Sequence, residues 1–316
     1  MAFHDTIKQL AELMDEMTEQ QKKVFQNVHQ GYPSEALVRF LKAREWNVPK
    51  AHKMLLDCLN WRLQNEIDNI LTGLPVFAIG VGQSSFDKAS VHYYVQSHIQ
   101  INEYRDRIIL PAAGKKFGKH IGTCIKVLDM TGLKLSALGQ IKLMTIISTI
   151  DDLNYPEKTE TYYIVNAPYV FSSCWKVVKP LLQERTRKKV QVLQGCGRDE
   201  LLKIMDYSSL PHFCRREGSS SSRSPLSSPG ADNCFSLDHP FHQQLYYHMK
   251  QQAHGRGSIV PIKQGSFHVT LPDPDPDGEM IAETIELEMH KYEEQSLAEH
   301  GNGLTPPING LKISSD

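Results

Sequence analysis

Residues 152–193 have the sequence DLNYPEKTETYYIVNAPYVFSSCWKVVKPLLQERTRKKVQVL, and this stretch decides the fold. Its β-branched and aromatic run Thr161–Val165 predicts a strand, which ends at Asn166-Ala167-Pro168. Apolar residues at three- and four-residue spacings then predict an amphipathic helix over Tyr169–Glu184. A second strand is predicted at Val190–Leu193. The stretch therefore predicts a strand–helix–strand unit of an α/β fold.

A basic cluster lies where the predicted helix ends: Arg185, Arg187, Lys188 and Lys189. Cations at a helix C-terminus often only complement its dipole, so Arg185, Arg187 and Lys188 are expected in solvent or at a membrane surface. Lys189 differs, because it opens a strand and its side chain can point inward. An apolar helix beside a cationic turn suits a ligand with an apolar body and an anionic head, as in a phospholipid.

The length allows two domains, or one domain with appendages. The net charge argues against attraction of nucleic acid or membranes by the protein as a whole. The chain has 316 residues, of which 40% are hydrophobic, and a net charge of −1. This charge provides no overall field to attract nucleic acid or an anionic membrane. No run approaches the ~18–20 apolar residues that span a bilayer, and the N-terminus does not resemble a secretory signal. The protein is expected to stay in the cytosol.

Motifs for covalent chemistry or metal binding are missing. There is no GxxxxGK[ST] loop, no GxSxG elbow and no HExxH helix. Gly80-Val81-Gly82 follows a predicted strand, but Ser85 replaces the third glycine of a dinucleotide fingerprint. The adjacent acids Asp151 and Asp152 are expected to cap a turn. We therefore predict no catalytic residue, no metal and no cofactor, only a bound phospholipid as ligand.

The cysteines and histidines do not change this prediction. Six cysteines lack CxxC spacing and are expected to be reduced thiols in apolar surroundings: Cys58, Cys124, Cys174, Cys196, Cys214 and Cys234. Four histidines of the C-terminal region lack the spacing of metal ligands: His239, His242, His248 and His254.

Residues 1–72 are predicted to form a helical unit. Apolar residues between Ile7 and Val28 indicate a single first helix. Pro33-Ser34 opens a second helix and Asn47-Val48-Pro49 a third, because proline is tolerated in a first helical turn. Such a small unit has a thin core and is expected to pack on another domain.

Residues 73–215 are predicted to form an α/β domain with a mostly parallel sheet. Its strands are expected at Pro75–Val81, Cys124–Met130, Thr161–Val165 and Val190–Leu193. Its helices are expected at Lys88–Leu110, Ser136–Asp151, Tyr169–Glu184 and Arg198–Asp206.

Residues 216–316 are predicted to form a Ser/Pro-rich linker and an acidic, largely flexible tail. The linker contains GSSSSRSPLSSPGAD, residues 218–232. Helices are expected at Pro240–Gln252 and Met280–Leu297, and an isolated strand at Ser266–Pro272. The tail has few apolar anchors, but some of its segments are expected to dock.

Three motifs carry a family resemblance. LVRFLKAREWNV (37–48), TCIKVLDMTGL (123–133) and YPEKTETYYIVNAP (155–168) resemble the CRAL–TRIO lipid-binding family. Within it, they are most similar to the phosphatidylinositol/phosphatidylcholine transfer proteins of the yeast secretory-pathway type and their plant relatives. The resemblance covers about residues 1–215. It implies an N-terminal helical unit packed on an α/β domain, whose sheet floors an apolar pocket gated by a mobile helix.

The resemblance also implies particular site residues. The lipid headgroup site corresponds to Arg44, Lys158, Thr186, Lys189 and Glu157, where Glu157 pairs with Lys189. Lys158 stands where some members have arginine, which keeps the charge but loses the bidentate fork. Arg44 has a competing role as an ion-pair residue that joins the two domains. The gate and acyl pocket correspond to Phe171, Trp175, Val178, Leu181 and Leu182, with Ile164 and Val127 as further lining residues.

Two departures from the family pattern stand out. Cys124 and Lys126 occupy strand positions where some members place hydroxyl residues for phosphatidylcholine, so the second lipid is left open. The connection between the two units is also short, because Ile70-Leu71 leads through Thr72-Gly73 almost directly into the next predicted strand. Either a segment is missing or the units join differently.

The expected function is phosphatidylinositol binding and transfer between membranes, presenting lipid to phosphoinositide metabolism. The expected partners are phosphatidylinositol, a second lipid, a transient membrane surface, and a lipid kinase or tail-binding protein, with no nucleic acid. We expect a cytoplasmic monomer that associates peripherally with Golgi, endosome or plasma membrane. Two alternatives stay open: a carrier of a sterol, tocopherol or terpenoid, and an adaptor that acts through its tail.

Overall fold

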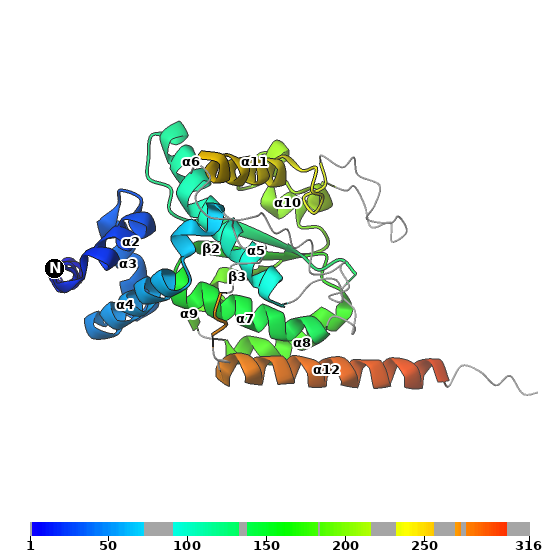
Figure 1. The fold of residues 1–316 in the computed structure, drawn as a ribbon. Coiled ribbons are helices and arrows are strands. Elements are labelled where there is room, and N and C mark those ends of the chain that lie inside the picture. Colours follow the sequence, from blue (N-terminus) through cyan, green and yellow to red (C-terminus); the bar gives the residue numbers. More distant parts are fainter. Residues whose placement is uncertain are drawn as a thin grey trace, which may run out of the picture.

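The structure is a computed structural model that describes residues 2–72, 91–132, 138–182, 184–215, 232–255, 269–272 and 276–301. Figure 1 shows a group of N-terminal helices beside an α/β body, with two helices from the C-terminal region on that body. Gly73, the predicted strand at Pro75–Val81, Gly80-Val81-Gly82 and most of the linker lie outside the described residues. The two alternatives for the short connection are therefore still predictions.

The N-terminal unit contains α1 (Ala2–Leu13), the 3-10 turn η1 (Met14–Glu16), α2 (Glu19–His29), α3 (Pro33–Ala43) and α4 (Val48–Gln64). The prediction of a single helix through Ile7 and Val28 was wrong, because Thr18 starts a new helix. Its hydroxyl accepts from the Gln21 N–H at 3.2 Å, and its own N–H donates to Gln21 Oε1 at 3.0 Å. This capping box gives hydrogen-bond acceptors to two backbone N–H groups at the start of α2, those of Thr18 and Gln21.

The predicted starts of the next two helices are confirmed. Pro33 stands in the first turn of α3, and the Asn47 side chain caps α4 by accepting from the Lys50 N–H at 2.9 Å. The helices enclose a core that includes the fully buried residues Leu10, Leu41, Leu55 and Leu59.

A parallel sheet confirms the predicted α/β architecture. Within the described residues its strands are β1 (Cys124–Asp129), β2 (Thr159–Val165) and β3 (Val190–Val192), in the order β1-β2-β3. The register pairs Val127 with Tyr163 and Ile164 with Val192. Successive side chains of a strand point to opposite faces. Val127, Tyr163 and Val165 accordingly pack with Leu201 and Phe213 in one core.

Within the described residues, the helix predicted at Lys88–Leu110 contains a π turn and continues beyond Leu110. It is divided into α5 (Val91–Tyr104), the π turn η4 (Arg105–Ile109) and α6 (Leu110–Phe117). The Leu110 N–H donates to the Arg105 carbonyl, five residues back. Pro111, which follows, has no N–H to continue the regular α pattern. π turns are frequent at functional sites.

The helix predicted over Tyr169–Glu184 is shorter than expected. It comprises α8 (Tyr169–Val178) and the 3-10 turn η6 (Lys179–Leu181), which contains Pro180, and Leu182 is extended. The basic cluster forms its own helix, α9 (Glu184–Lys189), so Lys189 ends a helix instead of opening β3. Pro180, in the 3-10 turn that follows α8, has no N–H to donate and explains why α8 does not continue.

The remaining elements of the α/β body complete the layers around the sheet. They are η2 (Ile67–Thr72), α7 (Leu138–Asn154), α10 (Arg198–Leu201), η7 (Tyr207–Ser209) and η8 (His212–Cys214). The helix predicted at Arg198–Asp206 thus covers only its first turn. Asp151 lies within α7, so the expected turn cap was also wrong.

Two helices of the C-terminal region pack on this body. The first, α11 (Pro240–Gly255), buries Leu245 and Met249 in a core shared with η2, α5 and α7. The second, α12 (Pro276–Gly301), lies along α7 and α8 (Figure 1). Val269–Pro272, the described part of the predicted strand, forms no strand; the Thr270 N–H donates to Asn65 Oδ1 at 2.7 Å.

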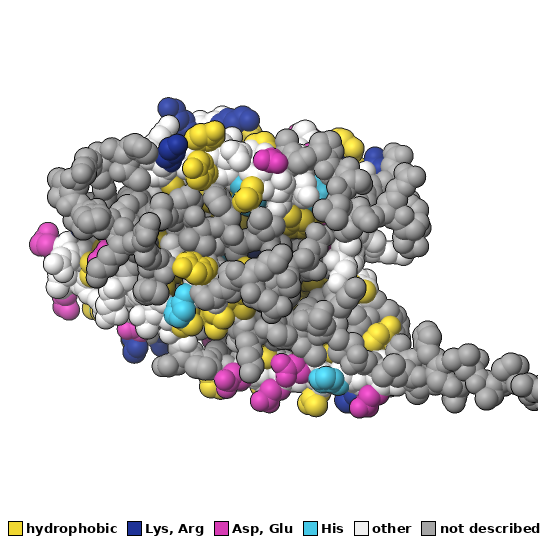
Figure 2. All heavy atoms as spheres, turned by 45° about the vertical axis from the view of Figure 1, so that its right-hand side comes forward, with side chains coloured by type: hydrophobic (Ala, Val, Ile, Leu, Met, Phe, Trp, Pro, Cys, Tyr) yellow, Lys and Arg dark blue, Asp and Glu magenta, His cyan; other side chains and the backbone are white. Residues whose placement is uncertain are grey.

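The exposed face of α12 is acidic. Asp277, Glu279 and Glu283 are exposed on it, and Figure 2 shows acidic side chains gathered along the lower edge of the molecule. The opposite face buries Met289, which is 3% exposed, in a cluster with Cys174 of α8. Across the described parts of the chain, no helix has both the length and the apolar character that crossing a membrane requires.

Candidate functional site

A cavity of 280 Å³ lies among β1, β2, α7, α8 and α9. Its lining combines the predicted headgroup residues Glu157, Lys158, Thr186 and Lys189 with the predicted gate residues Trp175 and Leu182. Lys126, Leu128, Tyr162 and Ile164 contribute from the sheet face opposite Val127. The strand alternation therefore places Ile164 in the cavity wall and Val127 in the core behind it.

The polar end of the cavity is organised around Glu157. The Lys189 ammonium lies 2.7 Å from Glu157 Oε2, and Arg185 Nη1 lies 3.8 Å from Oε1. Glu157 has a left-handed backbone with φ of 56°, which is uncommon for a non-glycine residue. Thr186 also lines the cavity, one residue after Arg185. The side chains expected to hold a lipid phosphate are thus gathered, with Glu157 as the counter-ion of Lys189.

Arg44 lies beside this end but does not line the cavity. Its Nη1 donates to the Ala43 carbonyl at 2.9 Å, and Arg185 Nη1 donates to the same oxygen at 2.6 Å. Burial and the neighbouring Arg185 lower the pKa of Arg44, while Asp152 acts in the opposite direction. The Ala43 carbonyl ends α3, so this oxygen connects the helical unit to α9.

The apolar end is formed by part of the predicted gate. Trp175 and Leu182 line the cavity, whereas Phe171, Val178 and Leu181 do not. Phe171 stacks on Trp175 with ring centroids 6.2 Å apart. Val178 is buried and Leu181 is 36% exposed. The gate residues therefore take different positions because the helix ends at Val178 and the following residues leave its axis.

Lys126, which stands at one of the two strand positions that depart from the family pattern, lines the cavity beside Asp151, which was not predicted as a cavity residue. Lys126 Nζ lies 3.2 Å from Asp151 Oδ2, and His98 Nε2 lies 2.7 Å from Asp151 Oδ1. Burial would raise the pKa of Asp151, but His98 and Lys126 hold it below its usual value. Asp151 lines the cavity and His98 does not. His98 thus holds the Asp151 carboxylate, which in turn positions the Lys126 ammonium in the cavity wall.

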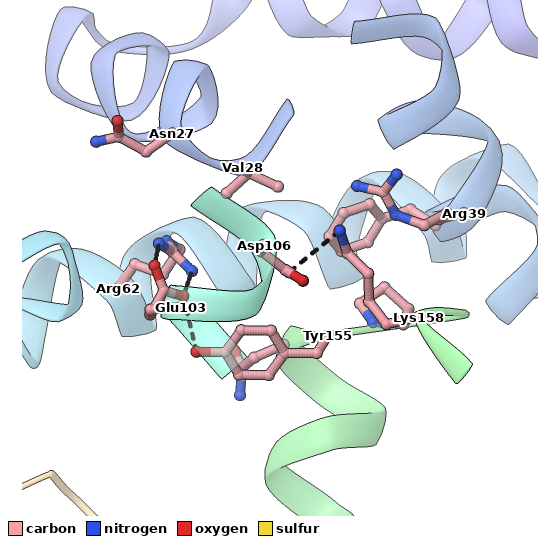
Figure 3. Close-up of a pocket in the computed structure, with 11 residues that line it drawn as sticks. Asn27, Val28, Arg39, Arg62, Glu103, Asp106, Tyr155 and Lys158 are labelled. Atoms are coloured by element: carbon pink, nitrogen blue, oxygen red, sulfur yellow. Dashed lines mark hydrogen bonds and ion pairs between the residues drawn. The ribbon is translucent and has the colours of Figure 1, made fainter. Parts of the chain in front are cut away.

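Lys158 connects this cavity to a second polar region, shown in Figure 3. Its ammonium lies 3.1 Å from Asp106 Oδ2 on the π turn, and Arg105 Nε lies 2.6 Å from Asp106 Oδ1. Burial would raise the pKa of Asp106, but Lys158 and Arg105 lower it. The π turn thus supplies both Asp106, the ion-pair partner of Lys158, and Arg105, a second cation on the same carboxylate.

A buried ion pair next to Lys158 joins the helical unit to the α/β body. Arg62 of α4 donates to Glu103 of α5 at 2.8 Å from both Nη1 and Nη2, and the Tyr155 hydroxyl donates to Glu103 Oε1 at 2.8 Å (Figure 3). The adjoining space measures 10 Å³, about the size of one water. It is too small for a lipid.

The described residues include no group of three or more histidine, cysteine or acidic side chains placed to hold a metal ion. All six cysteines lie in the described ranges and have free thiols. Burial raises the pKa of Cys58 and Cys214 to about 12. These two thiols are therefore poor nucleophiles at neutral pH.

Comparisons with known proteins agree with this architecture. Residues 6–57 match the family described as "CRAL/TRIO, N-terminal domain", and residues 72–214 match "CRAL/TRIO domain". The chain belongs to the CRAL–TRIO family. The predicted resemblance is therefore confirmed, and the helical group and the α/β body correspond to its two matched regions.

This CRAL–TRIO chain is similar to lipid transfer proteins of plants and fungi. It is 29% identical over 207 residues to "Phosphatidylinositol/phosphatidylcholine transfer protein SFH12" of Arabidopsis thaliana; the match covers 56% of this chain and 38% of that protein. It is 27% identical over 204 residues to "SEC14 cytosolic factor" of Eremothecium gossypii, covering 55% of this chain and 66% of that one. The chain thus spans less than half the length of the plant relative.

Among solved structures, the CRAL–TRIO chain is similar to "Crystal structure of Sfh5", with a TM-score of 0.41 and 19% identity; the match covers 62% of this chain and 82% of that one.

Proposed function

We propose that this protein binds phosphatidylinositol and carries it between membranes without covalent chemistry. The observation that carries the proposal is the single cavity that joins Thr186 and Lys189 to Trp175 and Leu182. A phosphate can replace Glu157 beside Lys189, since charge-assisted hydrogen bonds favour phosphate as well as carboxylate. The names of the relatives, which state phosphatidylinositol and phosphatidylcholine transfer, support the same ligand class.

Loading the lipid requires the cavity to open. Its 280 Å³ falls below the roughly 300–1,000 Å³ typical of sites for drug-sized ligands, so it accommodates a headgroup but not two acyl chains. Each methylene left in water would cost about 0.8 kcal/mol, so the chains need an apolar cavity at once. We infer that α8 moves on a membrane surface, and that α12 must release it through the contact between Met289 and Cys174.

The cellular setting follows from this mechanism. A carrier of this kind works in the cytosol and binds membranes only while exchanging lipid. The exchanged phosphatidylinositol would then be available to a lipid kinase. The proposal assigns no chemical step to the protein itself.

Lipid identification after purification tests the proposal. Native mass spectrometry with analysis of extracted lipids would be applied to the wild type and to Thr186→Ala/Lys189→Ala. We expect phosphatidylinositol in the wild type and its loss from the double variant, because the phosphate loses its cation and a hydroxyl partner. The wild type should also move labelled phosphatidylinositol between vesicles.

Lys188→Ala is the matched control. Lys188 is on the same helix, but its side chain is 73% exposed and pairs with Glu184 at 2.7 Å. This variant should keep the lipid. A sterol, tocopherol or terpenoid in both wild type and double variant would contradict the phosphatidylinositol proposal and keep the carrier role. Partner capture by residues 217–316 without lipid in any sample would favour an adaptor.

A further inference from the structure

A second cavity lies between the helical unit and α6, away from the gate. It has a volume of 370 Å³, and its walls come from α2, α3, α6 and the turn at residues 118–122. It shares Lys158 with the headgroup cavity, but none of the predicted gate residues. We call this cavity the interdomain groove.

The groove is strongly cationic. Its walls contain Arg39, Lys115, Lys119 and Lys158, and the one carboxylate among its lining residues is Asp106. Asp106 already has ion-pair partners on both sides, Lys158 at 3.1 Å and Arg105 at 2.6 Å. Among the groove's described lining residues, one carboxylate therefore faces four cationic side chains, and the positive charge is not balanced within the groove.

Arg39 shows this imbalance most directly. Among the described residues its guanidinium has no hydrogen-bond or ion-pair partner, and its Nε is buried. Figure 3 shows Arg39 beside Lys158 and Asp106, at the junction of the groove with the small polar space. Burial lowers the pKa of Arg39, and Arg105 acts in the same direction; Asp106 and, more weakly, Glu35, which does not line the groove, only partly oppose this. A partly buried cation without a partner is costly, so an anion at this place would stabilise the fold.

The mouth of the groove is preformed and accessible. The Tyr32 and His120 rings stack with centroids 3.9 Å apart across the boundary between the two units. Burial lowers the pKa of His120; Glu35 acts in the opposite direction, and Arg39 and Lys158 lower it further. Lys115 and Lys119 are exposed at the same edge. The groove thus has exposed lysines at its mouth and less exposed cations, Arg39 and Lys158, inside.

We propose that the interdomain groove binds a phosphate-bearing anion, held by Arg39 and Lys158 inside and by Lys115 and Lys119 at its mouth. The negative charge of the anion balances the lining cations that Asp106 alone does not neutralise. It is either a soluble phosphate compound or the headgroup of a membrane lipid, and both share this chemistry. The groove shares Lys158 with the headgroup cavity but contains no predicted gate residue, so the proposal stands whether or not the protein transfers phosphatidylinositol.

Calorimetric titration of the full-length, lipid-loaded protein with pyrophosphate tests the site. We expect one pyrophosphate bound per chain, and an affinity about tenfold lower in Lys119→Glu, as for loss of one charged hydrogen bond. Arg39→Gln should also weaken binding. Lys116→Glu is the matched control, since Lys116 is exposed at the end of α6, three residues before Lys119, carries the same charge and does not line the groove.

Flotation with vesicles distinguishes the two sources of phosphate. Vesicles of phosphatidylcholine would be compared with vesicles that also contain phosphatidic acid. Binding that requires phosphatidic acid and is lost in Lys119→Glu identifies a lipid headgroup. Pyrophosphate binding without such flotation identifies a soluble ligand.

Three results would overturn the proposal. Equal losses in Lys116→Glu and Lys119→Glu would show a diffuse surface effect. Loss in Thr186→Ala/Lys189→Ala alone would place the anion in the headgroup cavity. No response to either pyrophosphate or phosphatidic acid would exclude the site, and a melting curve of Lys119→Glu like that of the wild type would show that the variant is folded.

Discussion

Single residues of the cavity wall bear on which lipids the proposed carrier would accept. Lys126 replaces the hydroxyl side chains that the family resemblance implies for phosphatidylcholine, and its ammonium lines the cavity beside Asp151. A choline group also carries a positive charge, so the two cations would repel each other. We therefore expect the proposed carrier to favour an anionic over a zwitterionic second lipid.

Lys126→Ser should admit phosphatidylcholine. The substitution removes the repelling ammonium and supplies a hydroxyl, while Asp151 keeps its partners His98 and Asn102. We expect a several-fold rise in the ratio of phosphatidylcholine to phosphatidylinositol among the lipids extracted from the purified variant. Lys203→Ser, at an exposed site outside the cavity, is the control. An unchanged lipid ratio in Lys126→Ser would show that this lysine does not select the second lipid.

Asp151 makes part of the stability depend on pH. Its pKa is lower in the folded chain than in the unfolded chain, because His98 and Lys126 outweigh burial. This contribution is complete above the unfolded pKa of about 3.9 and is lost as the pH falls from there toward the folded value.

Asp151→Asn should consequently destabilise the protein more at neutral pH than in acid. Loss of charged hydrogen bonds costs on the order of 2 kcal/mol, and the difference from wild type should shrink by about 1 kcal/mol near pH 3. Urea unfolding at both pH values measures this. A difference that does not change with pH would mean that the pKa of Asp151 is not shifted by folding.

At this scale, the sequence predicts only part of the site. Glu157, Thr186 and Lys189 were found because they follow family motifs, and the structure brings all three to one cavity. Arg105 and Asp151 were not predicted as cavity residues, because local patterns do not reveal which face of the sheet meets a π turn or the end of α7. The headgroup and gate assignments remain predictions until a lipid is bound.

Secondary-structure elements were easier to predict than their ends. The parallel strands were recognised from β-branched runs, since these are strong local signals. The break at Thr18 was missed, because the apolar positions continue in phase from Leu10 to Val24 across the capping box. The same is true of α8, where Pro180 stands inside an apolar stripe that continues to Leu182.

Thr18→Ala tests the capping box that separates α1 from α2. Removing the hydroxyl leaves the Gln21 N–H without its acceptor and should lower the free energy of unfolding by about 1 kcal/mol. Thr18→Ser, which keeps the oxygen, is the control and should stay close to wild type. Chemical denaturation measures both; equal stabilities of Ala and Ser variants would contradict the assignment.

At the scale of the whole molecule, α12 packs against α8, the predicted gate of the cavity. The helix α12 was predicted, but its position along α8 was not, because few apolar residues mark its buried side. Burial raises the pKa of Cys174 at this contact, with Glu288 as a further cause. Docking of α12 therefore protects this thiol and restrains α8.

Met289→Asp should release α12 and speed phosphatidylinositol transfer between vesicles several-fold, because a buried charge disfavours the docked state. Cys174 should then react faster with a thiol reagent. Leu287→Asp is the control, since Leu287 is on the same helix and 62% exposed. Equal effects of the two substitutions, or no gain in thiol reactivity, would show that α12 does not hold the gate.

The ion pair between Lys189 and Glu157 has a consequence for the kinetics of lipid capture. Because the predicted headgroup cation already has an internal partner at 2.7 Å and the chain has a net charge of only −1, the headgroup cavity projects little field into solution. Diffusional encounter with a bilayer should thus vary little with ionic strength. The exchange of Glu157 for a phosphate takes place only at contact, so salt acts on the residence time of the complex and not on its rate of arrival.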